Sequence, residues 1–348
     1  MNGVSKVSDT ALRRMIANML MIGFDEAELS ADNIICRQIA EEGIGGVILF
    51  DRFYHDRERL KNIYNPRQLK QLTRQLQEAA SGRLLIAVDQ EGGRVQRLKS
   101  EYGFHHTPSA REIAASGETA ATEAYDVLSK MLSECGINCN FAPDVDLALN
   151  DKNHVIVGLE RSYGKSPDTV ARFGGIFADA LKAEGVVPVL KHFPGHGSSL
   201  EDSHKGFVDV SETWSEEELE PFRILIEAGK ADMVMTAHVF NRNLDPKYPA
   251  TLSHTVTTGL LRDKLGFDGV IISDDLQMEA IASQYSLEET VTLAINAGVD
   301  MLLFGNQLGS NDAVELIDLI EKQVRSGAVP YERIEEANRR IDELKGSM

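Results

Sequence analysis

Short apolar runs recur along the chain, and the stretches between them carry apolar residues at helical spacing. A run that is hydrophobic at nearly every position is typical of a parallel strand covered on both faces, whereas an amphipathic stretch predicts a helix. Amphipathic segments lie at 66–80, 168–183 and 215–228. The eight strand candidates are 20–24, 45–50, 84–90, 137–146, 186–193, 232–239, 269–275 and 300–305.

Strand and helix candidates alternate, and this alternation predicts parallel β/α units. Eight such units close naturally into a (β/α)₈ barrel of the TIM type, and a length of 348 residues suits one such barrel as a single domain over 1–348. The residues after the last strand, about 310–348, predict short C-terminal helices. An open doubly wound sheet is the alternative fold.

Polar residues that could take part in catalysis or binding cluster at the carboxyl ends of these strand candidates. They are Asp89, Asp146, Lys191, His192, His238, Asp274 and Asp275. Barrel enzymes place their active sites at that end of the strands. The pattern therefore favours the barrel over the open sheet and predicts where its site lies.

Composition narrows the class of partner. Fifty-four acidic against 36 basic residues give a formal net charge of -18, which disfavours binding to nucleic acid or to anionic membranes. We find no apolar run long enough for a transmembrane helix, and the first 20 residues read as an amphipathic helix rather than a signal peptide. Three cysteines without a CxxC pattern indicate buried thiols in a reducing compartment, so we expect a cytoplasmic protein.

The segment 191–204 carries the densest set of candidate catalytic groups, including Lys191, His192, His196, Asp202 and His204. Histidine suits proton transfer near neutral pH, and a carboxylate close by can hold one ring nitrogen. Asp202 and His204 are near enough in sequence to form such a pair. A solvated polar loop is one alternative. Another is a metal site made of His192, His196, Asp202 and His204, although their spacing matches no zinc pattern.

Two further segments carry charge at strand ends. In 266–278, Asp274 and Asp275 end a strongly apolar strand, where a carboxylate is costly unless it is used or paired. Because side chains alternate along a strand, these two should point apart. In 88–98, Asp89 and the arginines that follow it could hold sugar hydroxyls, or could form a structural ion pair at a turn.

These segments together resemble glycoside hydrolase family 3, and in particular its single-domain bacterial β-N-acetylglucosaminidases that act on peptidoglycan fragments. The matching motifs occur in family order over roughly 40–300. They are VDQEGGRVQR, NFAPDVDL, ERSYG, KHFPGHGSSLEDSH, MTAHV, PATLS and LGFDGVIISDDLQM.

The resemblance implies a role for each matching residue. Asp274 corresponds to the nucleophile, His204 to the acid/base and Asp202 to the partner of that histidine. The sugar-binding positions correspond to Asp89, Arg97, Arg161, Lys191 and His192. The implied reaction is a retaining hydrolysis through a covalent glycosyl-enzyme, with no metal or cofactor. The role of Asp275 is left open.

The expected substrate is a small carbohydrate, a muropeptide that carries terminal N-acetylglucosamine, and the expected state is a monomer. The segment 149–164 is longer than in compact relatives and lies where a leaving group could sit, so the aglycone is open. Alternatives are a glycosyl phosphorylase, a hydrolase of the β-glucosidase type and a non-catalytic sugar-binding barrel.

Overall fold

The computed structural model describes residues 9–30, 32–200 and 206–348, and its centre is a parallel barrel. The strands occur in the order β11-β9-β7-β6-β3-β2-β1-β12, and a parallel bridge between Ile272 and Met301 closes the ring. The barrel strands are β1 (Leu20–Gly23), β2 (Gly46–Ile48), β3 (Leu85–Val88), β6 (Cys139–Asn140), β7 (Val187–Phe193), β9 (Met233–Thr236), β11 (Val270–Ser273) and β12 (Leu302–Phe304). Each of the eight predicted strands is thus confirmed, and so is the (β/α)₈ barrel.

The strands are buried along their whole length because side chains fill both sides of the sheet. Every residue of β7 is buried, and the residues of β1, β3, β9 and β11 are buried as well. A parallel strand covered by helices outside and by barrel side chains inside has no polar face. This double coverage explains the near-continuous apolar runs of the sequence.

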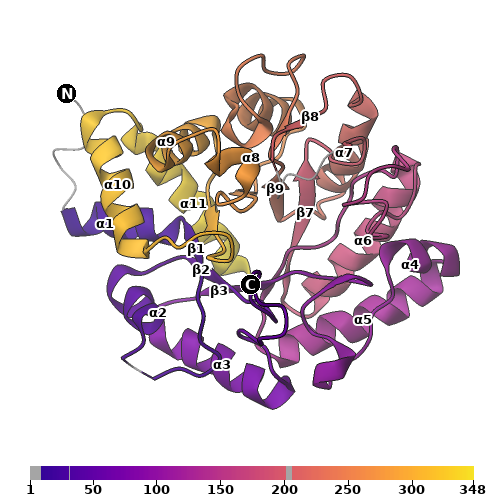
Figure 1. The fold of residues 1–348 in the computed structure, drawn as a ribbon, viewed down its shortest axis with the longest axis horizontal. Coiled ribbons are helices and arrows are strands. Elements are labelled where there is room, and N and C mark those ends of the chain that lie inside the picture. The colour runs from indigo at the N-terminus through magenta and orange to yellow at the C-terminus, as the bar shows by residue number, and fades with distance from the viewer. Residues whose placement is uncertain (1–8, 31, 201–205) are drawn as a thin grey trace.

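Helices surround the barrel (Figure 1). Predicted helix 66–80 is α3 (Pro66–Ala79), and 168–183 is α6 (Pro167–Ala183). Predicted helix 215–228 is two pieces, a 3₁₀ turn η4 (Glu216–Leu219) followed by α7 (Glu220–Glu227). The other helical elements are α1 (Asp9–Asn18), α2 (Ile34–Arg37), η2 (Gln38–Glu42), η3 (Ser100–Tyr102), α4 (Ala110–Ser116), α5 (Glu118–Glu134), η5 (Ala250–Leu252), η6 (Thr255–Lys264), α8 (Glu279–Ala282), α9 (Leu287–Ala297), α10 (Ala313–Ser326) and α11 (Tyr331–Ser347).

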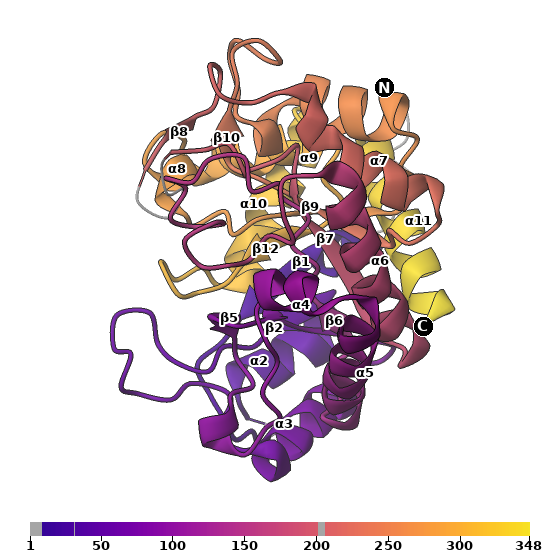
Figure 2. The ribbon, with the colours of Figure 1, turned by 90° about the vertical axis from the view of Figure 1, so that its right-hand side faces the viewer.

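The last helix, α11, lies across the amino ends of the barrel strands. Its Asn338 and Lys345 bond to Asn18, just before β1, and the carbonyl of Lys345 accepts from Arg83, just before β3. Figure 2 shows α11 and the C-terminus at one side of the molecule. Of the C-terminal helices expected within about 310–348, α11 therefore covers the end of the barrel opposite to the predicted site, and α10 packs against the outer helices α1 and α9.

Two small sheets were not anticipated from the sequence. The antiparallel pair β4 (Gln90–Gly92) and β5 (Val95–Gln96) follows β3, and the parallel pair β8 (Val208–Asp209) and β10 (Val239–Phe240) lies beyond β7 and β9. Each is only two or three residues long, which is too short to give a periodic pattern. The first of them presents Arg94 and Arg97 to the carboxyl end of the barrel.

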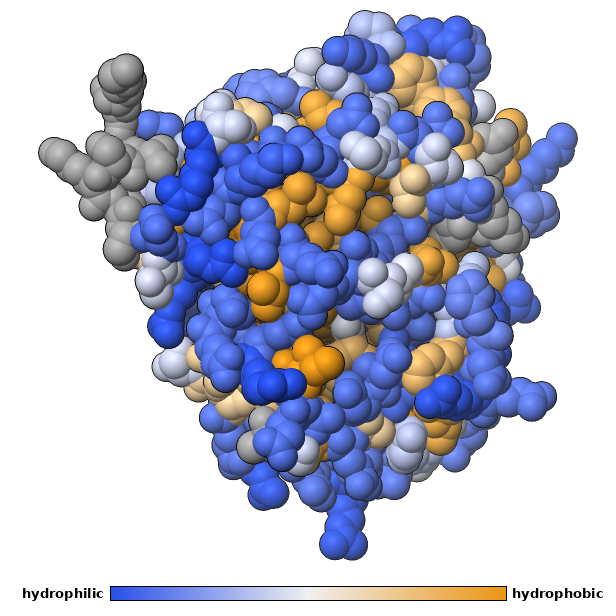
Figure 3. Space-filling view, turned by 60° about the vertical axis from the view of Figure 1, so that its left-hand side comes forward, coloured by the Kyte–Doolittle hydropathy of each residue, from blue (hydrophilic) through white to orange (hydrophobic). Residues whose placement is uncertain are grey.

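The surface and the thiols agree with the composition. All three cysteines are buried and unpaired, as predicted. Within the described part of the chain, every helix falls short of the length and apolarity that crossing a bilayer requires. Figure 3 shows a largely hydrophilic face with hydrophobic side chains gathered near its middle.

Candidate active site

A cavity of about 620 Å³ opens at the carboxyl ends of the barrel strands. Its wall includes Asp274 and each of the residues expected to bind sugar, which are Asp89, Arg97, Arg161, Lys191 and His192. These residues are spread over most of the chain, yet the parallel strands bring them to one place. The fold thus brings six predicted site residues together. Asp202 and His204 lie outside the described residues, so their roles stay predictions.

Lys191 lies at the centre of a charge network on the cavity wall. Its Nζ is 3.0 Å from Oδ1 of Asp89 and 2.7 Å from Oε1 of Glu91, and Arg97 Nη2 is 3.1 Å from Oδ2 of Asp89. Burial alone would raise the pKa of Asp89, but the Lys191 and Arg97 charges outweigh it and hold that pKa below its ordinary value. Asp89 therefore stays ionised and can accept hydrogen bonds from sugar hydroxyls.

Arg161 is fixed by a two-pronged contact. Its Nε and Nη2 each donate to a different oxygen of Glu91 at 2.8 Å, and Nε is 3.2 Å from Oδ2 of Asp144. Only 9% of the Arg161 side chain is exposed. A planar guanidinium held by a carboxylate on both prongs has little freedom, so Arg161 presents its remaining N–H groups in a fixed direction.

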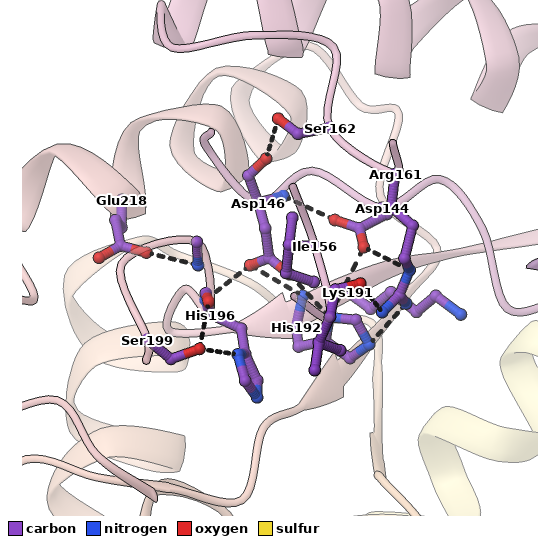
Figure 4. Close-up of polar contacts among 12 residues, drawn as sticks. Asp144, Asp146, Ile156, Arg161, Ser162, Lys191, His192, His196, Ser199 and Glu218 are labelled. Atoms are coloured by element: carbon purple, nitrogen blue, oxygen red, sulfur yellow. Dashed lines mark hydrogen bonds and ion pairs between the residues drawn. The ribbon is translucent and has the colours of Figure 1, made fainter. Parts of the chain in front are cut away.

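His192 is oriented from both sides of its ring, as Figure 4 shows. Nδ1 is 2.7 Å from Oδ2 of Asp146, and Nε2 is 3.3 Å from Nη2 of Arg161. Because a guanidinium only donates, this contact fits the tautomer in which Nδ1–H donates to Asp146 and Nε2 accepts. The ring is then held in one orientation at the cavity wall.

Two buried carboxyl groups behind His192, Asp144 and Asp146, have pKa values that are shifted in opposite directions. Burial raises the pKa of Asp146, yet the hydrogen bond from the His192 ring outweighs burial and brings that pKa down to about 2. Burial and the neighbouring Asp146 charge raise the pKa of Asp144 well above its ordinary value. Asp146 therefore gives up its proton more readily than Asp144 does.

Asp144, Asp146 and His192 could in principle offer three ligand atoms, which lie within 4.8 Å of one another. The Arg161 guanidinium already lies against Asp144 and His192, and it would repel a metal ion there. These three residues therefore fit a hydrogen-bonded histidine with its carboxyl partners better than they fit a metal site.

The candidate nucleophile follows directly after β11, which ends at Ser273. Asp274 Oδ1 accepts from the backbone N–H of Asp275 at 2.8 Å, and Asp275 Oδ1 accepts from that of Gln277 at 3.0 Å. His238 Nε2 lies 2.9 Å from the Asp275 carbonyl oxygen. Both aspartates line the cavity, and whether their side chains point apart stays a prediction. The strand ends before them, so its alternation does not reach these positions.

A loop, 194–206, follows β7 and contains most of the segment 191–204 that carries the candidate catalytic groups. Its beginning is fixed in the interior. Glu218 Oε2 accepts from the backbone N–H groups of Gly197 at 3.0 Å and Ser198 at 3.3 Å (Figure 4). Asn153 Nδ2 donates to the carbonyl of His196 at 2.8 Å. A Cβ at Gly197 would lie 1.8 Å from the carbonyl oxygen of Leu147, so only glycine fits there. The segment that leads to Asp202 and His204 is therefore anchored by 149–164, the stretch that looked long in the sequence.

Several site residues were not assigned from the sequence. Asp146 stood out as a strand-end carboxylate, and Glu91 lies two positions after Asp89, but nothing local showed which partners either of them holds. Asp144 has the same signal, two residues before Asp146. Asn153 and Glu218 carry none, because an asparagine in a polar loop and a glutamate in an acidic turn are ordinary.

Comparison with known proteins places the chain in a class. Residues 11–344 match the family described as Glycosyl hydrolase family 3 N terminal domain. A β-hexosaminidase of Tolumonas auensis is 38% identical over 316 residues, which cover 89% of this chain and 88% of that relative. A β-hexosaminidase of Xylella fastidiosa strain M12 is 36% identical over 309 residues, covering 86% of this chain and 87% of the relative.

Solved structures agree with these relatives. A glycoside hydrolase family 3 β-N-acetylglucosaminidase from Paenibacillus sp. FPU-7 superposes with a TM-score of 0.87 at 36% identity, and the match covers 97% of this chain but 62% of that one. A β-N-acetylhexosaminidase from Beutenbergia cavernae superposes with a TM-score of 0.84 at 28% identity, covering 98% and 99%. The chain belongs to glycosyl hydrolase family 3, as its motifs indicated.

Proposed function

We propose that the chain is a retaining exo-β-N-acetylglucosaminidase, with Asp274 as nucleophile and His204 as acid/base. The observation that carries this proposal is the shared cavity, where Asp274 lies on the same wall as five sugar-binding candidates. The activity in the names of the relatives supports it.

In the first step, a carboxylate oxygen of Asp274 attacks the anomeric carbon while the bond from that carbon to the leaving oxygen breaks. His204, oriented by Asp202, gives its proton to the leaving oxygen. In the second step, His204 takes a proton from water, the water oxygen bonds to the anomeric carbon, and the bond to Asp274 breaks. The two steps return both residues to their starting states.

The network around Lys191 supports a pocket that holds one terminal sugar. Asp89 offers acceptors for hydroxyl groups, whereas Lys191, Arg97 and Arg161 offer donors. His192, with Nδ1 bound to Asp146, adds a fixed ring at the same wall. Because the cations and carboxylates already pair with one another, they need no rearrangement when sugar enters.

The finer part of the proposal concerns substrate and setting. We propose that one domain over 1–348 acts as a monomer in the cytoplasm on small muropeptides, from which it releases terminal N-acetylglucosamine in peptidoglycan recycling. Nucleic acid and membranes are not partners in this proposal, and the reaction uses no cofactor.

The test uses two chromogenic substrates, the 4-nitrophenyl β-N-acetylglucosaminide and the matching β-glucoside. Wild type should release nitrophenol from the first much faster, and Asp274→Ala should lower kcat by about a thousandfold or more. Equal or faster release from the glucoside would overturn the substrate. Turnover that depends on added phosphate would point to the phosphorylase instead.

A further inference from the structure

The lining of the cavity carries more basic than acidic residues. Seven arginine or lysine residues line the cavity, against four aspartates, in a chain whose net charge is -18. A local excess of this sign cannot follow from composition, which would predict the opposite.

Most of these cations are already neutralised. Lys191, Arg97 and Arg161 pair with Asp89 and Glu91, as described above. Lys99 Nζ lies 2.6 Å from Oδ2 of Asp51. Arg52 binds Glu101 and the hydroxyl of Tyr102. These pairs hold the cavity wall together and leave little charge for a ligand.

Arg57 and Arg94 are different. Both line the cavity and are exposed, and within the described ranges no carboxylate oxygen lies within ion-pair distance of either guanidinium. Arg57 lies over the ring of Tyr54, 5.8 Å from its centroid, and Arg94 Nη1 donates to the carbonyl of Gly158 at 3.4 Å. Both contacts orient the side chains without cancelling their charge.

The two arginines come from separate segments that the fold fixes in place. Arg57 follows β2, in a segment tied down by Gln307, whose side chain accepts from Tyr54 N at 3.0 Å and donates to the Arg52 carbonyl at 2.9 Å. Arg94 lies in the turn of the β4–β5 hairpin, three positions before Arg97. Arg97 pairs with Asp89 at the sugar pocket, whereas Arg94 is exposed at the mouth. The unpaired charge therefore lies on exposed residues of the cavity lining, whereas the paired Lys191 and Arg161 are buried in its wall.

We propose that Arg57 and Arg94 form a subsite for a carboxylate on the leaving group. This inference rests on the proposed function and deepens it, since it assigns residues that distinguish acidic from neutral leaving groups. A guanidinium recognises a carboxylate with two parallel N–H donors, and a neutral sugar offers no group of that charge. On a muropeptide the carboxylate is either the lactyl group of the second sugar or an acidic group of its peptide.

The experiment measures kcat/KM for four substrates that share the same terminal sugar. They are N-acetylglucosaminyl-β-1,4-N-acetylmuramic acid, its lactyl methyl ester, the same disaccharide with an acidic peptide on the lactyl group, and N,N′-diacetylchitobiose. We expect wild type to prefer the two acidic substrates to the ester and to chitobiose. A higher kcat/KM for the free acid than for the peptide substrate identifies the lactyl carboxylate as the recognised group. A higher kcat/KM for the peptide substrate identifies an acidic group of the peptide.

Arg57→Ala and Arg94→Ala should each lower the ratio of acid to ester kcat/KM by about twofold to fivefold, the range of an exposed ion pair. The double variant should bring the ratio close to one. Added salt should lower the wild-type ratio, because it screens exposed charges. Arg59→Ala is the matched control, since Arg59 is on the same segment, lies over the ring of Phe53 and does not line the cavity.

Equal wild-type rates for acid, peptide substrate and ester, with nitrophenol still released from the chromogenic glycoside, would overturn the subsite and leave the proposed function intact. A ratio of acid to ester kcat/KM that is the same in the double variant as in wild type would also overturn the subsite. A wild type that cleaves neither these substrates nor the chromogenic glycoside would overturn the proposed function, and the subsite with it.

Discussion

Single side chains at this site act through the partners that hold them. His192 is the clearest case, because Asp146 receives one ring nitrogen and Arg161 faces the other. Asp146 also accepts the backbone N–H of His196 at 2.8 Å through its other oxygen. One buried carboxylate thus positions both the His192 ring, which we propose binds sugar, and the start of the 194–206 loop.

Asp146→Asn should disturb both contacts, because an amide has only one accepting oxygen. If the amide oxygen faces His192, the backbone N–H of His196 loses its acceptor. If the amide nitrogen faces His192, the ring must adopt the tautomer that carries its proton on Nε2, and this N–H then faces the Arg161 guanidinium. We expect KM for the N-acetylglucosaminide to rise and kcat/KM to fall by roughly tenfold to a hundredfold, or about 1–3 kcal/mol.

Steady-state kinetics checks this, with Asp151→Asn as the control in an exposed position. A fall in kcat alone, with KM unchanged, would contradict a role in holding the sugar-binding ring. Unchanged kinetics would show that the Asp146 carboxylate is not needed there.

Among the elements, the turn η4 has an unexpected role. It places Glu218 under the backbone of Gly197 and Ser198, where the side chain is buried (1% exposed). Burial raises the pKa of Glu218 to about 7, against which the hydrogen bonds from this backbone act. The anchor of the loop therefore titrates near neutral pH.

Because the pKa of Glu218 is higher in the folded chain than in the unfolded one, the free energy of unfolding should fall as the pH rises. Between pH 4.5 and 7, Glu218 keeps its proton in the folded chain and loses it in the unfolded one, so its contribution is present below about pH 4.5 and is lost as pH rises through about 7. Glu218→Gln is neutral throughout. From pH 5 to pH 8 the variant should therefore gain stability relative to wild type, by up to about 3 kcal/mol.

Urea unfolding at pH 5, 6, 7 and 8 measures this difference. Glu217→Gln is the control, because Glu217 is the exposed neighbour on the same turn. A stability difference between Glu218→Gln and wild type that stays constant with pH would rule out titration of Glu218 in this range.

At the scale of the whole molecule, one aspartate links several elements at the seam, the place where β11 and β12 close the barrel. Asp300 is fully buried just before β12, and its Oδ2 accepts from the backbone N–H of Ile271 in β11 at 2.9 Å and from Arg262 in η6. Its Oδ1 accepts from Arg333 and Arg340 of α11 at 3.2 and 3.3 Å. The closing strand pair, one outer helix and the C-terminal helix thus share a single carboxylate.

Asp300→Asn should lower the free energy of unfolding by about 3–5 kcal/mol, because it leaves three largely buried guanidinium groups around a neutral amide. Chemical denaturation measures it. Asp268→Asn is the control, since Asp268 is exposed and lies 3.6 Å from the same Arg340, and it should cost no more than about 1 kcal/mol. Similar losses in the two variants would contradict the role of Asp300 at the seam.

By itself the sequence determined what is local. The apolar runs follow from double coverage of each strand, and the strand-end positions of Asp89, Lys191, His192 and Asp274 follow from the periodicity of parallel units. The motifs around these residues sufficed to assign the family. The single-domain boundary, the monomer and the roles of Asp202 and His204 stay predictions.

Only the tertiary structure decided which groups meet. Glu91 and Arg161 are 70 residues apart, Asp146 and His192 are 46 apart, and Glu218 lies 21 residues from Gly197. No periodicity links such positions, because a hydrogen bond depends on distance in space and not on separation along the chain. For the same reason the sequence, with its 36 basic residues, could not show that Arg57 and Arg94 are left unpaired at the cavity mouth.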